Sequence, residues 1–181
     1  MKMKRLINFV VPVTACNFRC HYCYVGQEGR NTGELGQLQY SPEHIQRCMS
    51  VERWGGVCHI NICGLGETLI PEYTLDLTRR MLENGHYVSV VTNWILSNRL
   101  QAFCSFPLEY RQRLFIKFSF HYLELLRQEL LEEFFRNVCL IRDNGCAFSV
   151  ELTVNDETIP YITEIQKICR KEVGADCHVI E

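Results

Sequence analysis

Residues 55–93 read "GGVCHINICGLGETLIPEYTLDLTRRMLENGHYVSVVTN", and this stretch contains one full repeat of the fold. Gly55-Gly56 precede the apolar run "VCHINIC" (57–63), and Asn84-Gly85 precede the apolar run "YVSVVT" (87–92). Glycine between a helical pattern and an apolar run is typical of a helix C-terminus that leads into a strand. The stretch therefore predicts a strand, a helix and a second strand.

The same glycine signal recurs along the chain. From Gly55, the positions Gly85, Gly145 and Gly174 follow at intervals of 30, 60 and 29 residues, with the missing one expected near 109–113. About 30 residues is the length of one βα unit. We expect six strands, at residues 5–13, 57–63, 87–92, 114–120, 147–154 and 177–181. Near-continuous apolar runs of this kind indicate parallel strands that are covered on both faces.

Two of the predicted helices have clear signals. Residues 41–54 begin with Ser41 as N-cap and Pro42 at the first helical position, and residues 125–144 repeat apolar side chains at helical spacing up to Gly145. The chain is thus predicted to form an α/β domain with a mainly parallel sheet, either an open wound sheet or part of a barrel. The sixth strand ends the chain without a helix to cover it.

Composition excludes some classes of function. The 181 residues hold 19 Lys and Arg against 21 Asp and Glu, and no basic tract is present, so an obligatory nucleic-acid partner is not expected. No apolar stretch reaches the length of about 20 residues that spans a bilayer, so a membrane-embedded protein is not expected. Eleven cysteines, an odd number spread through predicted helices and strands, favour free thiols and a cytoplasmic location.

The N-terminus offers a second interpretation. "MKMKRLINFVVPVTAC" (1–16) has the basic start, apolar run and small-residue box of a bacterial lipoprotein signal. The same apolar run also fits a buried first strand, and export would place the remaining cysteines in an oxidising space. The buried strand is the favoured interpretation.

Three cysteines follow the first predicted strand in "CNFRCHYC" (16–23). Cys16, Cys20 and Cys23 supply three thiolates, whereas a structural zinc site and an ordinary ferredoxin cluster each use four ligands. His21 could complete a zinc site, but it is adjacent to Cys20 in a tight loop. Three cysteines within eight positions are too close together to be explained as free thiols that merely fill space in the loop. The loop lies at the carboxyl end of a strand, where parallel α/β folds gather their functional groups.

This motif resembles the Cys-x-x-x-Cys-x-aromatic-Cys signature of radical S-adenosylmethionine (radical SAM) enzymes, with Tyr22 as the aromatic residue. A second segment, "GLGETLIP" (64–71), resembles the family's Gly-Gly-Glu-Pro segment, which meets the amino group of the methionine moiety. It keeps Gly66 and Glu67 and departs from the family pattern at Leu65 and Thr68.

Three weaker matches follow in the family's order. "VVTNW" (90–94) resembles the family's third-strand ending Thr-Asn-Gly, with Trp94 in place of glycine. "KFSFHYLE" (117–124) resembles the segment that places a serine near the ribose of the cofactor. "VELTVND" (150–156) occupies the position of the family's fifth strand, which lines the adenosine pocket. The resemblance thus implies cofactor contacts at Tyr22, Gly64, Gly66, Glu67, Thr68, Thr92, Asn93, Ser119, Glu151 and Asn155. His121 is interpreted as an ordinary histidine of the rim, and the other eight cysteines mainly as small core residues.

The resemblance implies a partial (βα)6 TIM-like barrel and one radical SAM core domain over residues 1–181, complete or truncated. Its cofactors would be a 4Fe-4S cluster held by Cys16, Cys20 and Cys23, and S-adenosylmethionine bound to the remaining iron. Reductive cleavage would give a 5'-deoxyadenosyl radical that abstracts hydrogen from a substrate. An electron donor such as a flavodoxin or ferredoxin would be a partner, and a peptide is one candidate substrate. The alternative is a non-catalytic iron-sulfur or zinc-binding module that retains the fold.

Overall fold

A computed structural model describes residues 2–93 and 96–180, and its centre is one parallel β-sheet. The described part contains six strands, which pair in sequence order, each parallel to the next. Their bounds are β1 Leu6–Val11, β2 His59–Gly64, β3 Tyr87–Thr92, β4 Leu114–Ser119, β5 Ala147–Thr153 and β6 His178–Ile180. The α/β fold predicted from the sequence is confirmed.

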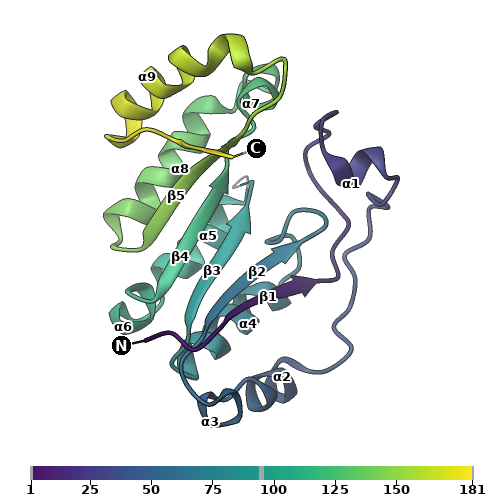
Figure 1. Cartoon of the computed structure of the whole chain (residues 1–181), viewed down its shortest axis with the longest axis vertical. Helices are drawn as coiled ribbons and strands as arrows, with labels where there is room; N and C mark the ends of the chain where they lie inside the picture. The colour runs from purple at the N-terminus through teal and green to yellow at the C-terminus, as the bar shows by residue number, and fades with distance from the viewer. Residues whose placement is uncertain (1, 94–95, 181) are drawn as a thin grey trace.

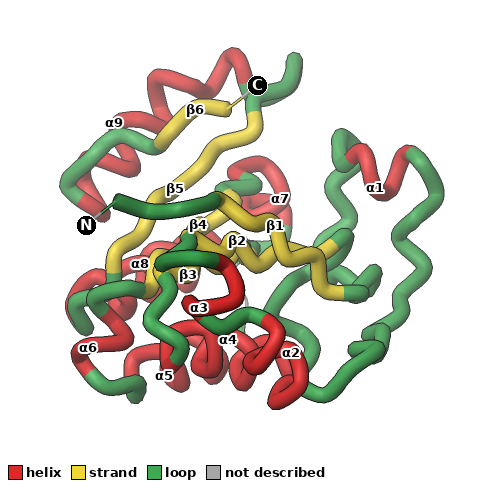
Figure 2. The backbone as a smooth tube through the Cα atoms, turned by 60° about the horizontal axis from the view of Figure 1, so that its bottom comes forward, coloured by secondary structure: helices red, strands yellow, loops and turns green. Residues whose placement is uncertain are grey.

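Sequential strand order decides between the two predicted architectures. A doubly wound sheet reverses its strand order at a switch point, and this sheet has no reversal. The crossover helices therefore gather on one face, as Figures 1 and 2 show for α4, α5 and α8, and the sheet curves as part of a barrel. β1 and β6 are the two edges and do not pair in the described part of the chain, so the barrel is open. The predicted partial barrel is confirmed.

The helices fill the connections between strands. Their bounds are α1 Tyr24–Gln27, α2 Pro42–Cys48, α3 Val51–Trp54, α4 Tyr73–Glu83, α5 Ser97–Cys104, α6 Leu108–Arg111, α7 Tyr122–Arg127, α8 Leu131–Asp143, the 3-10 turn η1 Ile159–Tyr161 and α9 Ile162–Val173. In Figure 1, α1 stands apart from the helical layer, on the long loop that follows β1. Among the described residues, no helix has the length and apolarity to cross a bilayer.

Both predicted helices are divided in the structure. Ser41 accepts from the His44 N–H as the predicted N-cap of α2, but the helix ends at Cys48 and α3 begins after a second cap, Ser50. The segment predicted as one helix over 125–144 is α7 followed by α8. Glu129 lies between them with a φ of 58°, a left-handed conformation that no α-helix continues through.

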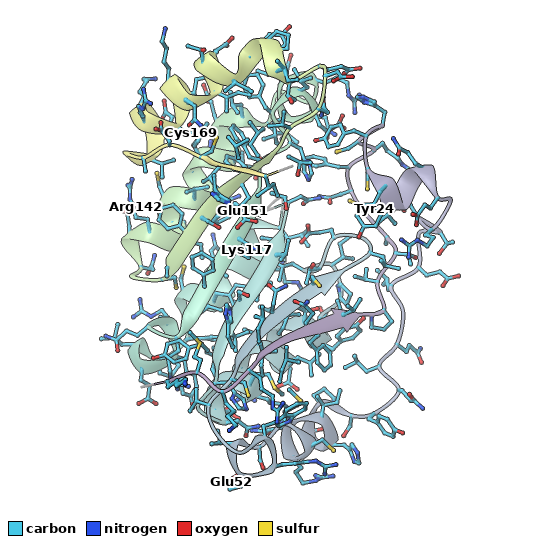
Figure 3. All side chains as sticks on the ribbon, viewed as in Figure 1. Tyr24, Glu52, Lys117, Arg142, Glu151 and Cys169 are labelled. Atoms are coloured by element: carbon cyan, nitrogen blue, oxygen red, sulfur yellow. The ribbon has the colours of Figure 1, made fainter. Side chains whose placement is uncertain are left out.

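The two faces of the sheet differ in polarity. Side chains toward the helices, such as Ile62, Val90 and Ile116, are fully buried and form the core. The opposite face has a polar ladder in which Asn61 donates to Asn8 at 3.1 Å and accepts from Ser89 at 2.7 Å. Farther along the same face, Lys117 and Glu151 form an ion pair at 3.2 Å, and Figure 3 labels both side chains on neighbouring strands. The inner face of the open barrel therefore carries polar side chains that pair with one another.

Candidate functional site

A pocket of about 500 Å³ lies at the carboxyl ends of β1 to β4. This volume falls in the usual range for small-molecule sites. Ten of the residues predicted for the site line it, namely Cys16, Cys20, Cys23, Gly64, Gly66, Glu67, Thr68, Thr92, Asn93 and Ser119. The structure thus brings together segments that follow four different strands.

The loop that holds the three cysteines is pinned at its base. The N–H groups of Thr14 and Ala15 donate to the Glu34 carbonyl at 2.8 and 2.9 Å, and the Thr14 hydroxyl bonds that of Thr32 at 2.7 Å. Gly36 has a φ of 65°, and a Cβ there would lie 1.6 Å from the Pro12 carbonyl oxygen. Only glycine satisfies both conditions, so the chain can return beside the residues that precede Cys16.

The thiols of Cys16, Cys20 and Cys23 are half-buried, and burial changes the pKa of Cys16 and of Cys20. Burial raises the pKa of Cys16, and the nearby Glu67 carboxylate raises it further. Burial also raises the pKa of Cys20 to about 11. Without a cation these two thiols are protonated at neutral pH, and a bound metal would displace the protons because the thiolate is the ligand.

Within residues 2–93 and 96–180, no three His, Cys, Asp or Glu side chains stand close enough together to hold one metal ion. A multi-iron cluster is wider than a single ion, so its ligands stand farther apart around it. Three soft thiols line one pocket, and such a donor set suits iron and sulfide. The residues present fit a cluster better than a single zinc ion.

The glycine-rich segment after β2 is shaped by its contact with the cysteine loop. A Cβ on Gly66 would lie 2.0 Å from the Ala15 carbonyl oxygen, and one on Gly64 would lie 2.5 Å from a Val13 methyl carbon. The Gly66 N–H donates to the Val13 carbonyl, and the Glu67 N–H donates to that of Ala15. The resemblance to the family implies cofactor contacts at both glycines. In the structure they allow two segments of this chain to approach each other.

Glu67 is buried, and its carboxylate joins the ends of β2 and β3. One oxygen accepts from the Leu69 N–H at 2.9 Å and from the Thr92 hydroxyl at 2.6 Å, while the other accepts from the Asn93 N–H at 2.7 Å. Burial raises the Glu67 pKa, and these three hydrogen bonds oppose that shift. The Glu67 side chain therefore holds the residues that follow β2 and the end of β3 together in the wall of the pocket.

Asn93 offers an unused polar atom at the pocket. Its amide nitrogen donates to Asn17 Oδ1 at 2.7 Å and to the Cys16 sulfur at 3.5 Å. Its Oδ1 is buried and has no hydrogen-bond partner. An unpaired buried carbonyl oxygen is costly, so its place in the wall of a pocket points to a ligand that donates to it.

His121, which the sequence analysis interpreted as an ordinary rim histidine, lines the pocket beside Ser119. Its Nδ1 lies 2.7 Å from the Tyr22 hydroxyl, and burial lowers its pKa to about 4. Tyr22 itself does not line the pocket, and burial raises its pKa. No sequence signal pairs these residues, because they are 99 positions apart.

Glu151 and Asn155 lie away from the pocket. Glu151 points to the inner face, where its half-buried carboxylate pairs with Lys117 and accepts from the Ser149 hydroxyl at 2.8 Å. Asn155 caps the turn that leads to η1, because its Oδ1 accepts from the N–H groups of Glu157 and Thr158. The structure gives both residues local partners, and neither reaches the lining of the pocket. Trp94, the residue that departs from the Thr-Asn-Gly pattern, lies outside the described residues.

Several lining residues were absent from the predicted set. Leu65 follows β2 and Val91 belongs to β3, whereas the others come from the cysteine loop and from α1 and the turn after it: Phe18, Arg19, His21, Tyr24, Val25, Gly26, Gln27, Gly29 and Asn31. For the residues of the cysteine loop and α1, nearness to the three cysteines in sequence is the signal that could have found them.

The fold and the site together define a class, an open parallel (βα) barrel with a thiol-lined pocket at the carboxyl rim. No model of a protein family matches the chain, and no curated protein sequence matches it. Among solved structures, the fold is similar to that of SuiB from Streptococcus suis bound to the precursor peptide SuiA, with a TM-score of 0.68 and 14% identity. SuiB bound to S-adenosylmethionine gives a TM-score of 0.67 at 13% identity.

These alignments cover 94% of this chain but only 37% and 38% of the two SuiB chains. At such low identity the likeness establishes a shared fold. It extends over nearly all of this chain.

Proposed function

We propose that this chain is a radical SAM enzyme, or the core domain of one, with a 4Fe-4S cluster held by Cys16, Cys20 and Cys23. The observation that carries the proposal is the convergence of these three thiols on one rim pocket with the Gly64–Thr68 segment and Asn93. The two motifs that resemble the family's signatures are 40 residues apart in sequence, yet they face the same cavity.

When bound, the cluster and S-adenosylmethionine would supply a one-electron cleavage that yields methionine and a 5'-deoxyadenosyl radical. The chain's own task is to orient the cofactor and exclude water. Asn93 Oδ1 would accept a hydrogen bond from the cofactor, because it is the unpaired acceptor in the wall. Ser119 would contribute a hydroxyl from the end of β4. The S-adenosylmethionine in a SuiB structure of the same fold supports this assignment.

The other predicted contacts have different parts in the proposal. Glu67 would act by holding Thr92 and Asn93 in place, and Gly64, Gly66 and Thr68 by shaping the wall through their backbone. Tyr22 would act through the cysteine loop. Glu151 and Asn155 would meet the cofactor only if the adenosine moiety extends beyond the pocket along β5.

The substrate and partners are inferred more broadly. We include a peptide among the candidate substrates, because a SuiB structure contains a precursor peptide and the inner face of this barrel is polar. A flavodoxin or ferredoxin would supply the electron, and residues 1–181 would act as one core domain in the reducing cytoplasm.

Iron and sulfide analysis of the anaerobically reconstituted chain tests the ligand assignment. Replacement of Cys16, Cys20 or Cys23 by Ala should each abolish cluster binding. Cys139→Ala is the matched control, because that thiol lies between α8 and α9 and donates to the Glu172 carbonyl at 3.6 Å. Loss of iron in Cys139→Ala, or full iron in the other three variants, would contradict the assignment.

Cleavage of S-adenosylmethionine separates an enzyme from a non-catalytic module. The dithionite-reduced protein should release 5'-deoxyadenosine and methionine in equal amounts, and the three cysteine variants should release neither. A cluster that binds but never cleaves the cofactor would favour the non-catalytic alternative. Binding of zinc in place of iron under the same conditions would favour it as well.

A further inference from the structure

The edge of the sheet at β1 has backbone groups that no neighbouring strand pairs. In Figure 1, β1 has β2 on one side and no strand on the other. The Arg5 carbonyl accepts from the His59 N–H at the start of β2. Because the direction of the backbone groups alternates along a strand, every second residue from Arg5 onward faces β2. The residues in between, whose N–H and C=O groups face the open edge, are Leu6, Asn8 and Val10.

The same three residues expose an apolar surface. Their backbone groups make no hydrogen bond within the described part of the chain. Their side chains share the inner face of the barrel, where the Asn8 side chain accepts from that of Asn61. Leu6 is 68% exposed and Val10 is 57% exposed, although both side chains are large and apolar. The edge therefore offers unpaired backbone groups and apolar side chains next to one another.

This edge also lacks the usual protection against pairing. Edge strands are commonly kept from pairing with other chains by shortness, charged side chains, prolines or bulges. The other edge strand, β6, is short, with three residues. β1 has six residues, none of them charged and none a proline, and its register with β2 is continuous. A neutral, regular edge of this length fits an uncharged, extended main chain.

β1 leads directly to the pocket. In Figure 1 its arrow points toward the segment that carries α1. The strand ends at Val11, five residues before Cys16, which lines the pocket. Between them, the Val13 carbonyl accepts from the N–H of Gly66 in the pocket wall. A strand added beside Val10 would therefore have its neighbouring residues beside the segment that forms the pocket.

We propose that the edge of β1 binds the substrate as an extended peptide segment, which pairs through its main chain with Leu6, Asn8 and Val10 and presents one residue to the pocket. This inference rests on the proposed function and names the form in which the substrate is held. Main-chain pairing gives affinity that depends little on sequence. Contacts with Leu6 and Val10 add a preference for apolar side chains at every second position of the peptide.

Hydrogen exchange at single-residue resolution tests the pairing in the reconstituted full chain. The probe is a capped hexapeptide of alternating valine and threonine. In the free protein, the amide hydrogens of Asn8 and Val10 should exchange faster than those of Ile7 and Phe9, which face β2. With the peptide at about ten times its dissociation constant, exchange at Asn8 and Val10 should slow about tenfold. The amides of α9 should be unaffected.

Two substitutions separate main-chain pairing from side-chain contact. Val10→Pro removes one N–H from the open edge and leaves the ladder between β1 and β2 intact, because this N–H does not face β2. It should weaken binding of a fluorescently labelled form of the peptide about fivefold, which corresponds to one hydrogen bond. Val10→Thr is the matched control, because it keeps the N–H and the β-branched shape. It should bind the peptide as the unaltered protein does.

A hexapeptide methylated at every backbone nitrogen tests the same bonds with the protein unaltered, so it decides the matter should Val10→Pro fail to fold. It should leave the exchange at Asn8 and Val10 unchanged. Equal slowing by the methylated and unmethylated peptides, or no slowing by either, would overturn the inference. A dimer of the free protein that Val10→Pro dissociates would overturn it as well, because the edge would then bind a second copy. Absence of iron or of S-adenosylmethionine cleavage would instead overturn the proposed function, and neither measurement involves the peptide.

Discussion

Replacement of Glu67 should destabilise the protein even in the absence of any cofactor. The Glu67 carboxylate accepts from two backbone N–H groups and one hydroxyl, and the side chain is only 3% exposed. An unpaired buried donor costs about 1–3 kcal/mol. Since the side chain borders a pocket that water can enter, we take the low end for each of the three donors. Glu67→Ala should then lower the free energy of unfolding by about 3 kcal/mol.

Glu67→Gln should be milder. A glutamine keeps one acceptor oxygen and turns its NH2 group toward a donor, so that one contact of the three is lost and the cost is about 1–2 kcal/mol. Both variants are to be compared by urea unfolding under reducing conditions, followed by circular dichroism. Glu72→Gln is the control, because that carboxylate is 89% exposed and its pairing with Arg99 is worth little.

The result separates two roles for Glu67. A carboxylate that only contacts the cofactor would leave the stability of the free protein unchanged when replaced and would weaken cofactor binding alone. Glu67→Ala with the stability of the unaltered protein would therefore refute the assignment of a bridge between the ends of β2 and β3.

Three further substitutions test other parts of the structure by the same unfolding assay. Gly66→Ala should disrupt the rim because its Cβ would meet the Ala15 carbonyl, whereas Gly26→Ala, with nothing within 4 Å, should be tolerated; equal stabilities would contradict the close approach. Glu129→Gly should stabilise by about 1 kcal/mol, since glycine adopts a φ of 58° without strain, and a destabilised variant would argue against the break between α7 and α8. Lys117→Met should cost about 1–2 kcal/mol by leaving the Glu151 carboxylate without its cation and with the Ser149 hydroxyl as its donor, and adding Glu151→Leu should recover most of it; no recovery would count against the pair.

The sequence predicts the strands well because their signals are local. The run 87–92 has the same bounds in the structure as in the prediction, and the run 5–13 is shortened to β1, Leu6–Val11, because Pro12 has no N–H for the ladder. The predicted helices failed where the backbone leaves the helical conformation. Ser50 provides a second cap that ends one of them, and Glu129 gives no composition signal for a left-handed turn.

The features of the site also divide into those that local sequence predicts and those that it does not. The cysteine spacing and the glycine-rich segment are local patterns, and both line the pocket as the rim rule predicts. The bridge from Glu67 to Thr92 and Asn93 joins residues about 25 positions apart, and the contact of Tyr22 with His121 joins residues 99 apart. Contacts at such separation depend on how strands are placed beside one another, and no single stretch of sequence records that placement.

The hydrogen bonds at the base of the cysteine loop have a consequence for how the chain can vary. Thr14 and Ala15 donate to the Glu34 carbonyl, so the two ends of the loop formed by residues 16–33 are held side by side whatever lies between them. Insertions or deletions within residues 24–31 should therefore leave β1 and α2 in place, since a closed surface loop transmits little strain to its anchors. Residues 24–31, beside the thiols, can therefore vary in length while the anchoring residues stay in place. Variants with a longer or shorter segment here offer a route to changed access to the pocket.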